Sequence, residues 1–341
     1  MTSAATRTPR LTPGQSIRLV RVTAIVACVF GTAVLSWQYF RFPMVFPGPA
    51  LLDVALEIPL VLVGVVLVRL LRPVRAPALI WSAAAVAWGA TAAAGCALLA
   101  NRGLISLWAK GVGPHFAATW SASLSAPVNE EILKACGVVM VALAAPRVIR
   151  GPLDGMIFGA IVGLGFQAAE NVTYGLNSIL LDGGTDPAQA VVNSWLVRVG
   201  LTALGSHWAM SAVAGAGVGY LVARARGAPH GGVLPAVACL LVAMAMHVEF
   251  DAPQLALGVK VGLNFAVVAV LYLLLSHAYL SRAHGVLDDS VAAGIITPDE
   301  AASLLSRRRR HRELARATAA ERGLLAARQR ALLADVEGGA A

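Results

Sequence analysis

The chain has 341 residues, of which 58% are hydrophobic and 13% are charged, and its formal net charge is +9. Such a chain has too little polar surface to cover a soluble globule and too few charges to be disordered, so it is predicted to be a membrane protein. Its arginines recur in short clusters between apolar runs, which indicates membrane topology and argues against nucleic acid as a partner.

The N-terminal stretch MTSAATRTPRLTPGQSIRLVR is polar and basic. It is too long for the start of a signal peptide, and the apolar run that follows lacks an obvious small-residue cleavage site. We therefore expect residues 1–18 to form a basic cytoplasmic tail before a retained membrane anchor.

Apolar windows of about 20 residues, the length that crosses the hydrocarbon of a bilayer, recur along the chain up to residue 280. They predict an all-α polytopic membrane protein with about eight transmembrane helices, in a membrane domain over residues 19–280. The windows lie near residues 19–40, 51–72, 78–100, 127–146, 153–180, 195–223, 232–250 and 257–280. The fourth window is short and is charged at its start.

Four cysteines lie singly inside these apolar segments. We expect them to be small core residues and not disulfide partners. They are Cys28, Cys96, Cys136 and Cys239.

Basic residues predict which way the chain crosses the membrane. Arginine clusters precede the first window and follow the second, fourth and sixth, whereas the opposite loops carry few basic residues. Because basic loops stay on the cytoplasmic side, we expect a multi-pass protein of the cell membrane with both termini in the cytoplasm.

Residues 281–341 are predicted to form a small helical cytoplasmic tail, because leucines and alanines recur there at helical spacing among many charges. Thr297, Pro298 and Glu300 match an N-cap, a first-turn proline and a capping-box acid, so a helix is expected to begin at Thr297. The run Arg307–Arg310 fits either contact with anionic lipid headgroups or a solvated helix face.

Charged residues at the start of the fourth window need an explanation, because ionised side chains in lipid are costly and are usually paired and functional. One interpretation is structural. Glu130 and Glu131 would favour a helix N-terminus that Ser125 caps and in whose first turn Pro127 lies, and Lys134 would pair with Glu130.

A functional interpretation comes from depth. Four residues that are unfavourable in lipid lie on four different spans. Counted by helix rise, each lies roughly 22–25 Å from the predicted cytoplasmic end of its span, which is in the outer half of a bilayer about 30 Å thick. They are Glu131, Glu170, His207 and His247.

Other polar residues extend this group. Asp251 follows His247 by one helical turn on the same side, and a histidine or metal facing it would offset the cost of an acid at a helix C-terminus. Glu57 and Arg198 are expected to pair inside the membrane. The remaining histidines are interpreted as loop, end or tail residues; they are His115, His230, His277, His284 and His311.

Glutamates and histidines gathered from different spans suit a metal. Two histidines and one glutamate with an open position are a common catalytic zinc arrangement, and a further carboxylate can then take a proton from bound water.

These residues resemble the PrsW family of intramembrane metalloproteases, which are relatives of the CAAX-processing glutamate proteases. The matching core covers about residues 125–250. It consists of Glu130-Glu131-x-x-Lys134, Phe166-x-x-x-Glu170-Asn171, His207 after Arg198, and His247.

The resemblance implies hydrolysis of peptide bonds in membrane-protein or membrane-anchored peptide substrates, such as an anti-sigma factor cut on its extracytoplasmic side. It also implies a divalent metal, most simply zinc, bound by Glu170, His207 and His247. The CAAX relatives carry a histidine where Glu170 stands and are thought to work without a bound metal, so a metal-independent glutamate mechanism is the alternative.

The resemblance assigns catalytic roles to four further residues. Glu130 and Glu131 would activate water and contact the metal or the transition state, beside Lys134, and Asn171 would orient or polarise the scissile carbonyl. Two other classes stay open at this point: a proton- or cation-coupled transporter, which also uses intramembrane Glu and His residues, and a non-catalytic membrane scaffold.

Overall fold

A computed structural model describes residues 12–340 of the chain. The protein is 86% helical, and the described residues contain no strand, so the all-α prediction is confirmed. In chain order the elements are α1 (Pro13–Tyr39), α2 (Arg41–Val45), α3 (Pro47–Leu71), α4 (Leu79–Ala87), the π-helical turn η1 (Trp88–Ala93), α5 (Ala94–Gly111), α6 (Pro114–Ala144), α7 (Pro152–Leu181), α8 (Pro187–Trp195), the π-helical turn η2 (Leu196–Leu201), the 3₁₀ turn η3 (Ala203–Gly205), α9 (His207–Ala225), α10 (Val233–Asp251), α11 (Leu257–Ala292), α12 (Pro298–Leu304), α13 (Arg307–Arg316) and α14 (Ala319–Ala340).

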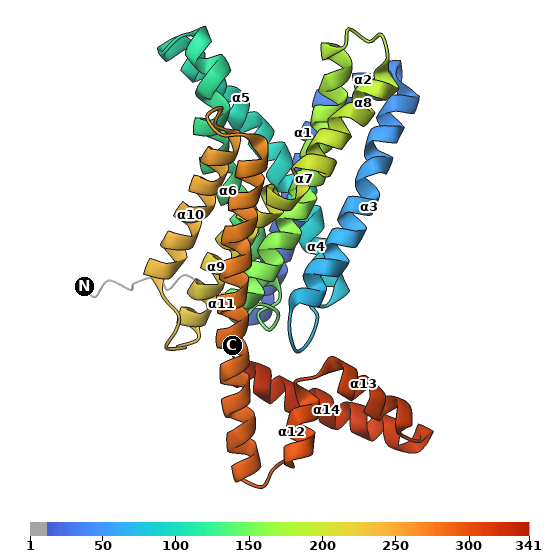
Figure 1. The fold of residues 1–341 in the computed structure, drawn as a ribbon, viewed down its shortest axis with the longest axis vertical. Helices are drawn as coiled ribbons and strands as arrows, with labels where there is room; N and C mark the ends of the chain where they lie inside the picture. Colours follow the sequence, from blue (N-terminus) through green and yellow to red (C-terminus); the bar gives the residue numbers. More distant parts are fainter. Residues whose placement is uncertain (1–11, 341) are drawn as a thin grey trace, which may run out of the picture.

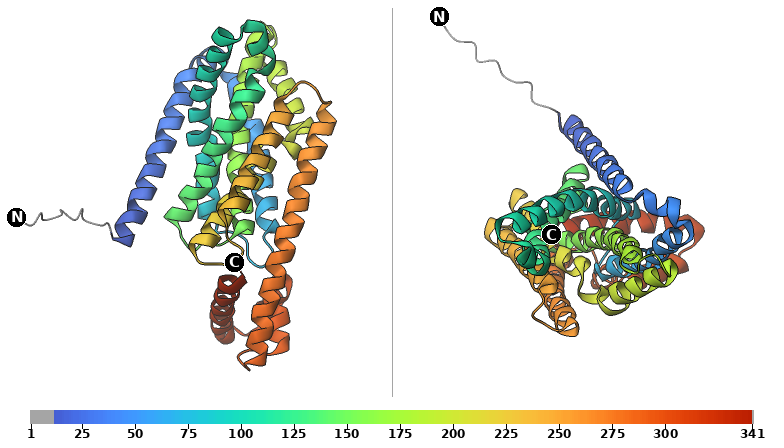
Figure 2. Two further views of the ribbon diagram at one scale, coloured as in Figure 1. Left: turned by 90° about the vertical axis from the view of Figure 1, so that its left-hand side faces the viewer. Right: turned by 90° about the horizontal axis from the view of Figure 1, so that it is seen from above.

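The long helices run alongside one another around α7, and α12–α14 lie beyond one end of the bundle (Figure 1). We call this end the tail side. The most apolar stretch of α7 is 94% buried, against 6% in α1, so α7 is the axis of the bundle and α1 faces lipid. The start of α1 and the continuation of α11 into the tail lie at the same end (Figure 2). Residues 1–11 of the predicted N-terminal tail lie outside the described residues, and residues 13–18 belong to α1.

Among residues 12–340, six helices are long and apolar enough to cross a membrane. They correspond to six of the eight predicted windows, and the protein is a multi-pass membrane protein. The other two windows correspond to α6, which carries three charged residues near its middle, and to the interrupted path from α8 to α9. A count of eight crossings therefore stays a prediction.

Glycines bring α9 against α7 at backbone contact. A Cβ atom on Gly159 would lie 2.1 Å from the carbonyl oxygen of Ser211, and one on Gly215 would lie 2.3 Å from that of Gly155. Such distances exclude any side chain, so the two helices are packed through the small-residue face that the sequence places after His207. This contact fixes the height of α9 against the central helix.

The predicted span over residues 195–223 is not one continuous helix. After α8 the backbone passes through η2 and η3 and restarts at His207 as the first residue of α9. Asn264 of α11 donates a hydrogen bond to the carbonyl of Gly205 (2.9 Å), which ties the interruption to a neighbouring helix. Hydropathy alone could not show this break, because the interrupting residues are as apolar as their neighbours.

The last membrane-domain helix, α11, continues to Ala292, past the predicted start of the tail at residue 281. The first short tail helix is capped as predicted, and the tail docks onto the bundle. Thr297 and Glu300 form the capping box at the start of α12. Neither interpretation of the arginine run holds for Arg307 and Arg310: both donate hydrogen bonds to the carbonyl of Val74, beyond the end of α3, at 3.4 Å and 2.6 Å. Arg308 and Arg309 are exposed.

The cysteines are free, as predicted, but their placement in the core was wrong. Cys136 is exposed, and Cys28, Cys96 and Cys239 are only partly buried. In a bundle surrounded by lipid, an apolar window has outward faces that are as apolar as its core faces, so composition does not tell them apart.

Candidate active site

The acidic pair Glu130–Glu131 lies near the middle of α6, and the interpretation of these acids as a helix N-terminus was wrong. α6 begins at Pro114, after Gly113 reverses the chain at φ 117°, and continues through Pro127. Ser125 is no cap, because its hydroxyl accepts a hydrogen bond from Trp108 (3.1 Å). The dipole of α6 therefore does not offset the free-energy cost of burying these two carboxylates. Nearby cations or bound protons must offset it instead.

Lys134 supplies one such cation. Its ammonium group lies 2.7 Å from Oε1 of Glu131 and 3.6 Å from Oε2 of Glu130, and it has no exposed surface. It also donates to Nδ1 of His207 (3.1 Å) and lies 4.4 Å from the ring centroid of Phe166. Lys134 thus joins the two acids of α6 to His207 of α9.

His247 is held by carboxylates on both ring nitrogens. Nδ1 lies 2.9 Å from Oε1 of Glu131, and Nε2 lies 3.4 Å from Asp251 and 3.8 Å from Oε2 of Glu130. A histidine therefore faces Asp251, as expected for an acid at the unfavourable C-terminal end of a helix. Lys260 donates to the carbonyl of Phe250 (3.0 Å) and so stabilises the same helix end.

His207 lies between α6 and α7. Its Nε2 is 2.5 Å from Oε2 of Glu170, and its Nδ1 is 3.9 Å from Oε2 of Glu130. The ring centroids of His207 and His247 are 5.0 Å apart. A carboxylate on one ring nitrogen fixes the tautomer and directs the other nitrogen inward.

Arg198 reaches the same carboxylate from the other side of the break. It contacts Oε2 of Glu170, donates from Nε to Oδ1 of Asn171 (2.7 Å), and lies over the ring of Tyr174 at 4.0 Å. In an unbroken helix nine residues would separate Arg198 from His207 by about 13.5 Å along the axis. The interruption at η2 and η3 therefore lets both residues bind Glu170.

Asn171 connects this group to α3. Its Nδ2 donates to Oε2 of Glu57 (3.0 Å) while its Oδ1 accepts from Arg198. The predicted Glu57–Arg198 pair is thus bridged by the Asn171 amide instead of being direct.

Three residues could hold a metal ion together: Glu130, His207 and His247, whose ligand atoms all lie within 4.8 Å of one another. All three are buried, at 1–4% exposure. Oε2 of Glu130 and Oε2 of Glu131 are also buried and make no hydrogen bond with any residue between 12 and 340. Orphaned carboxylate oxygens beside imidazole nitrogens are a donor set that suits a borderline divalent cation, so the residues fit a metal.

The formal charges of the cluster agree with this fit. Four carboxylates, on Glu130, Glu131, Glu170 and Asp251, face two permanent cations, Lys134 and Arg198. With neutral imidazoles the group has a formal charge of −2, which one divalent cation balances. Glu170 was predicted as a metal ligand; it lies against the outer nitrogen of His207, and its role as a ligand stays a prediction.

One contact residue was missed from the sequence. Asn101 donates to Oε1 of Glu130 (2.9 Å) and accepts from Asn129 (2.8 Å). The predicted third window ended at residue 100, but the helix continues to Gly111. A polar Asn that follows an apolar run inside a continuing helix was the available signal. Of the histidines set aside, His115, His277, His284 and His311 are exposed.

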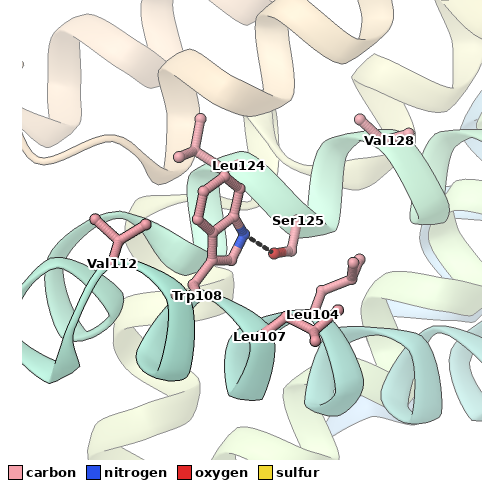
Figure 3. A pocket seen from close by; sticks show the side chains of 8 residues that line it. Leu104, Leu107, Trp108, Val112, Leu124, Ser125 and Val128 are labelled. Atoms are coloured by element: carbon pink, nitrogen blue, oxygen red, sulfur yellow. Dashed lines mark hydrogen bonds between the residues drawn. The ribbon is translucent and has the colours of Figure 1, made fainter.

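A separate pocket of about 440 Å³ lies between α5 and α6, and Val128 in its wall is two residues from Glu130. Figure 3 shows the indole of Trp108 donating to Ser125 across it. Apart from this pair the lining is apolar, so the pocket adds no acid, base or ligand to the cluster.

Comparisons with known proteins identify the chain. No curated protein and no solved structure matches it. The sequence profile described as PrsW family intramembrane metalloprotease matches residues 77–277, which is more than half of the chain and includes every member of the Glu, His and Lys cluster. The chain therefore belongs to the PrsW family of intramembrane metalloproteases and is a membrane-embedded peptidase.

Proposed function

We propose that the cluster of Glu130, Glu131, Lys134, His207 and His247 hydrolyses peptide bonds of membrane-protein or membrane-anchored substrates. The observation that carries this proposal is the convergence of α6, α9 and α10 on Oε2 of Glu130, with both histidines within 4 Å of it. Family membership favours hydrolysis over the transporter and the scaffold.

Glu130, His207 and His247 would hold the metal in this proposal. Zn²⁺ is the ion that two imidazoles and a carboxylate suit best, and when bound it lowers the pKa of a coordinated water and polarises a carbonyl oxygen. The carboxylates behind the histidines support this choice, because Glu170 lies on Nε2 of His207 and Glu131 lies on Nδ1 of His247. Each imidazole keeps its other nitrogen on the side of Glu130. A bound metal would take the place of the hydrogen bond from Lys134 to Nδ1 of His207 and would share Nε2 of His247 with Asp251.

Glu131 is the base in this proposal. Its Oε1 is engaged by Lys134 and His247, whereas its Oε2 makes no hydrogen bond with any described residue. Oε2 can take the proton of the attacking water, whose oxygen bonds to the scissile carbonyl carbon. The same proton then passes to the amide nitrogen as the carbon–nitrogen bond breaks.

Lys134 and Asn171 have supporting roles. The ammonium of Lys134 lies between Glu131 and His207 and stabilises the negative charge that develops on the carbonyl oxygen. Both ends of the Asn171 amide are engaged, with Glu57 and Arg198. This supports a positioning role in place of direct contact with the carbonyl.

We also infer that cleavage takes place near the extracytoplasmic face. Glu130 and His247 each lie 14 residues from the tail-side end of their helices, at Ala144 and Val233. This is about 21 Å by helix rise, well beyond the bilayer midplane if the basic tail side is cytoplasmic. Substrates that present a peptide bond at this depth would be membrane-anchored regulators with an extracytoplasmic domain, such as anti-sigma factors.

The test is cleavage of a panel of single-span reporters co-expressed with the protein. We expect Glu131→Gln and His207→Ala to abolish the cleavage that the wild type produces, while both variants still accumulate in the membrane. Glu249→Gln is the matched control, because this acid lies on α10 beside His247 and its carboxylate hydrogen-bonds to none of the described residues. Undiminished cleavage by both site variants would refute the proposal.

The metal content of two further purified variants, Glu130→Ala and Glu170→Gln, distinguishes which of these two acids is the metal ligand. We expect about one equivalent of metal in the wild type, none in Glu130→Ala, and binding weakened by about 10- to 100-fold in Glu170→Gln, as for a residue that orients a ligand. Complete loss in Glu170→Gln with retention in Glu130→Ala would restore Glu170 as the carboxylate ligand.

A further inference from the structure

A polar cavity lies on the tail side, far from the Glu and His cluster. Its volume is about 300 Å³, and its walls come from four separate parts of the chain: the α6–α7 connection, the α9–α10 connection, α11 and the end of α14. Such a volume is at the lower end of the range of small-ligand sites, about 300–1,000 Å³. Its polar lining consists of Arg150, Arg226, His230 and Arg282, and Gly338 completes the wall from the tail.

The described lining of this cavity contains three arginines and no acid. Two buried carboxylates are nearby. Asp154 pairs with Arg72 (2.7 Å) and lies 4.0 Å from Arg150, and Glu337 pairs with Arg150 (2.8 Å) and Arg75 (3.2 Å). Among residues 12–340, neither acid forms an ion pair with Arg226, which lines the same cavity.

Arg226 shows the effect of this crowding. One of its terminal nitrogens donates to the carbonyl of Pro146 and to that of Ile149 (3.2 Å). Arg226 is exposed overall, but partial desolvation of its guanidinium and the positive charge of Arg150 lower its pKa. An anion in the cavity would raise this pKa again, because it would add negative charge beside Arg226 and accept hydrogen bonds from its remaining N–H groups.

The location of the cavity suits a phosphate. Arg226 immediately follows α9, and Arg150 lies between α6 and α7, where the membrane-crossing part of the bundle ends. Bilayer phosphates lie at this level, and clusters of arginine recognise them through forked hydrogen bonds.

We propose that this cavity binds a phosphate-bearing anion, supplied either by an anionic lipid headgroup or by free phosphate in solution. Because Gly338 adjoins Glu337, which is 1% exposed and ion-paired to Arg150, the bound anion joins the tail to the membrane domain. This site is independent of the peptidase centre and of its metal.

The experiment measures thermal unfolding of the detergent-purified full chain with three probes: phosphatidylglycerol, zwitterionic phosphatidylcholine, and inorganic pyrophosphate. We expect phosphatidylglycerol or pyrophosphate to raise the unfolding temperature of the wild type and phosphatidylcholine to leave it unchanged. A response to the lipid alone identifies a headgroup, and a response to pyrophosphate identifies a soluble anion. No response to either anion overturns the proposal.

Charge-matched variants test the location. Arg226→Gln with Arg282→Gln should weaken binding of the active probe by about tenfold or more. Arg147→Gln with Arg224→Gln removes the same charge from the same end of the bundle at exposed residues outside the cavity and should leave binding unchanged. Equal losses in the two pairs would mean diffuse surface attraction and would overturn the proposal.

A third variant tests the site even if the double variant of Arg226 and Arg282 misfolds. A Cβ atom on Gly338 meets nothing within 4 Å, so Gly338→Glu introduces a carboxylate into the cavity without a clash. It should unfold at no lower temperature than the wild type in the absence of probe, because its carboxylate supplies negative charge to the arginines, and it should not respond to the anion. A wild-type response in Gly338→Glu contradicts the proposed site.

Discussion

Arg198 links the catalytic cluster to the α3 side of the bundle. Its guanidinium binds Glu170 and Asn171 and lies over Tyr174, while Asn171 binds Glu57 of α3. A planar fork can make these contacts at once, which a lysine ammonium cannot. We therefore regard Arg198 as a positioning residue that keeps Glu170 directed at His207.

Replacing Arg198 by Gln should lower the cleavage rate by about 10- to 100-fold, because His207 loses the fixed carboxylate behind it. Loss of a charged hydrogen-bond partner in this partly buried pair should also cost about 1.5–3 kcal/mol of unfolding free energy. Steady-state cleavage with metal analysis checks this: kcat should fall more than KM rises, and Arg198→Lys should rescue only part of the loss. Arg41→Gln is the control, since Arg41 also lies over an aromatic ring but away from the site. An unchanged kcat in Arg198→Gln would exclude the role.

At the residue scale the sequence predicted which side chains lie close together in the candidate site better than how they are oriented. Glu131, His207 and His247 were assigned from depth and resemblance, and they do meet. The structure turns each carboxylate toward a particular ring nitrogen, and this is set by rotamers and by the break before α9. Neither can be read from spacing, which is why Glu130 and not Glu170 faces both histidines.

At the scale of elements, the contact between α7 and α9 sets the position of His207. Gly159 and Gly215 allow the two backbones to touch. In a bilayer such close packing replaces the hydrophobic effect as the source of helix association. Any side chain here pushes α9, and with it His207, away from Glu170.

Gly159→Ala should therefore destabilise the protein by about 1–3 kcal/mol, the usual cost of overpacking, and should reduce cleavage in parallel. Gly262→Ala on α11 is the control, because a Cβ atom there meets nothing within 4 Å. It should stabilise the protein slightly, because alanine has a higher helix propensity than glycine. Thermal unfolding of the two purified variants measures the difference. Equal unfolding temperatures would show that the α7–α9 contact is not tight.

Hydropathy predicted where the apolar helices lie, with boundaries correct for α3 and α7 to within a few residues. It could not predict the start of α6, because the segment from Pro114 to Ala126 is too mixed in character to stand out as apolar. It also missed η1 and η2, since π-helical turns leave no signature in hydrophobicity.

At the scale of the whole molecule, the tail is part of the fold. Glu337 is buried against Arg72, Arg75 and Arg150, and Arg310 donates to the backbone beyond α3. The sequence predicted the tail helices and their first cap, but partners about 190–260 residues away in the chain could not be inferred from local pattern.

Glu337→Ala should release the tail, because it removes the buried acid that pairs with Arg150 and Arg75, and loss of one member of a buried ion pair costs about 3–5 kcal/mol. Limited proteolysis of membranes checks this: the connection near Gly294 should be cut much faster than in the wild type. Glu321→Ala, an exposed acid near the start of α14 that bonds Thr318, should leave the digestion rate unchanged. Wild-type protection in Glu337→Ala would mean that the tail is held by its apolar contacts instead.

Enclosure of the cluster has a consequence for regulation. The five residues of the proposed centre are between 0% and 4% exposed, so neither solvent nor a polypeptide reaches them while the helices stay as they are. The proposed centre would therefore be latent until the helices separate. Turnover would then depend on how often the bundle opens, and membrane proteins that do not open it would not be cleaved.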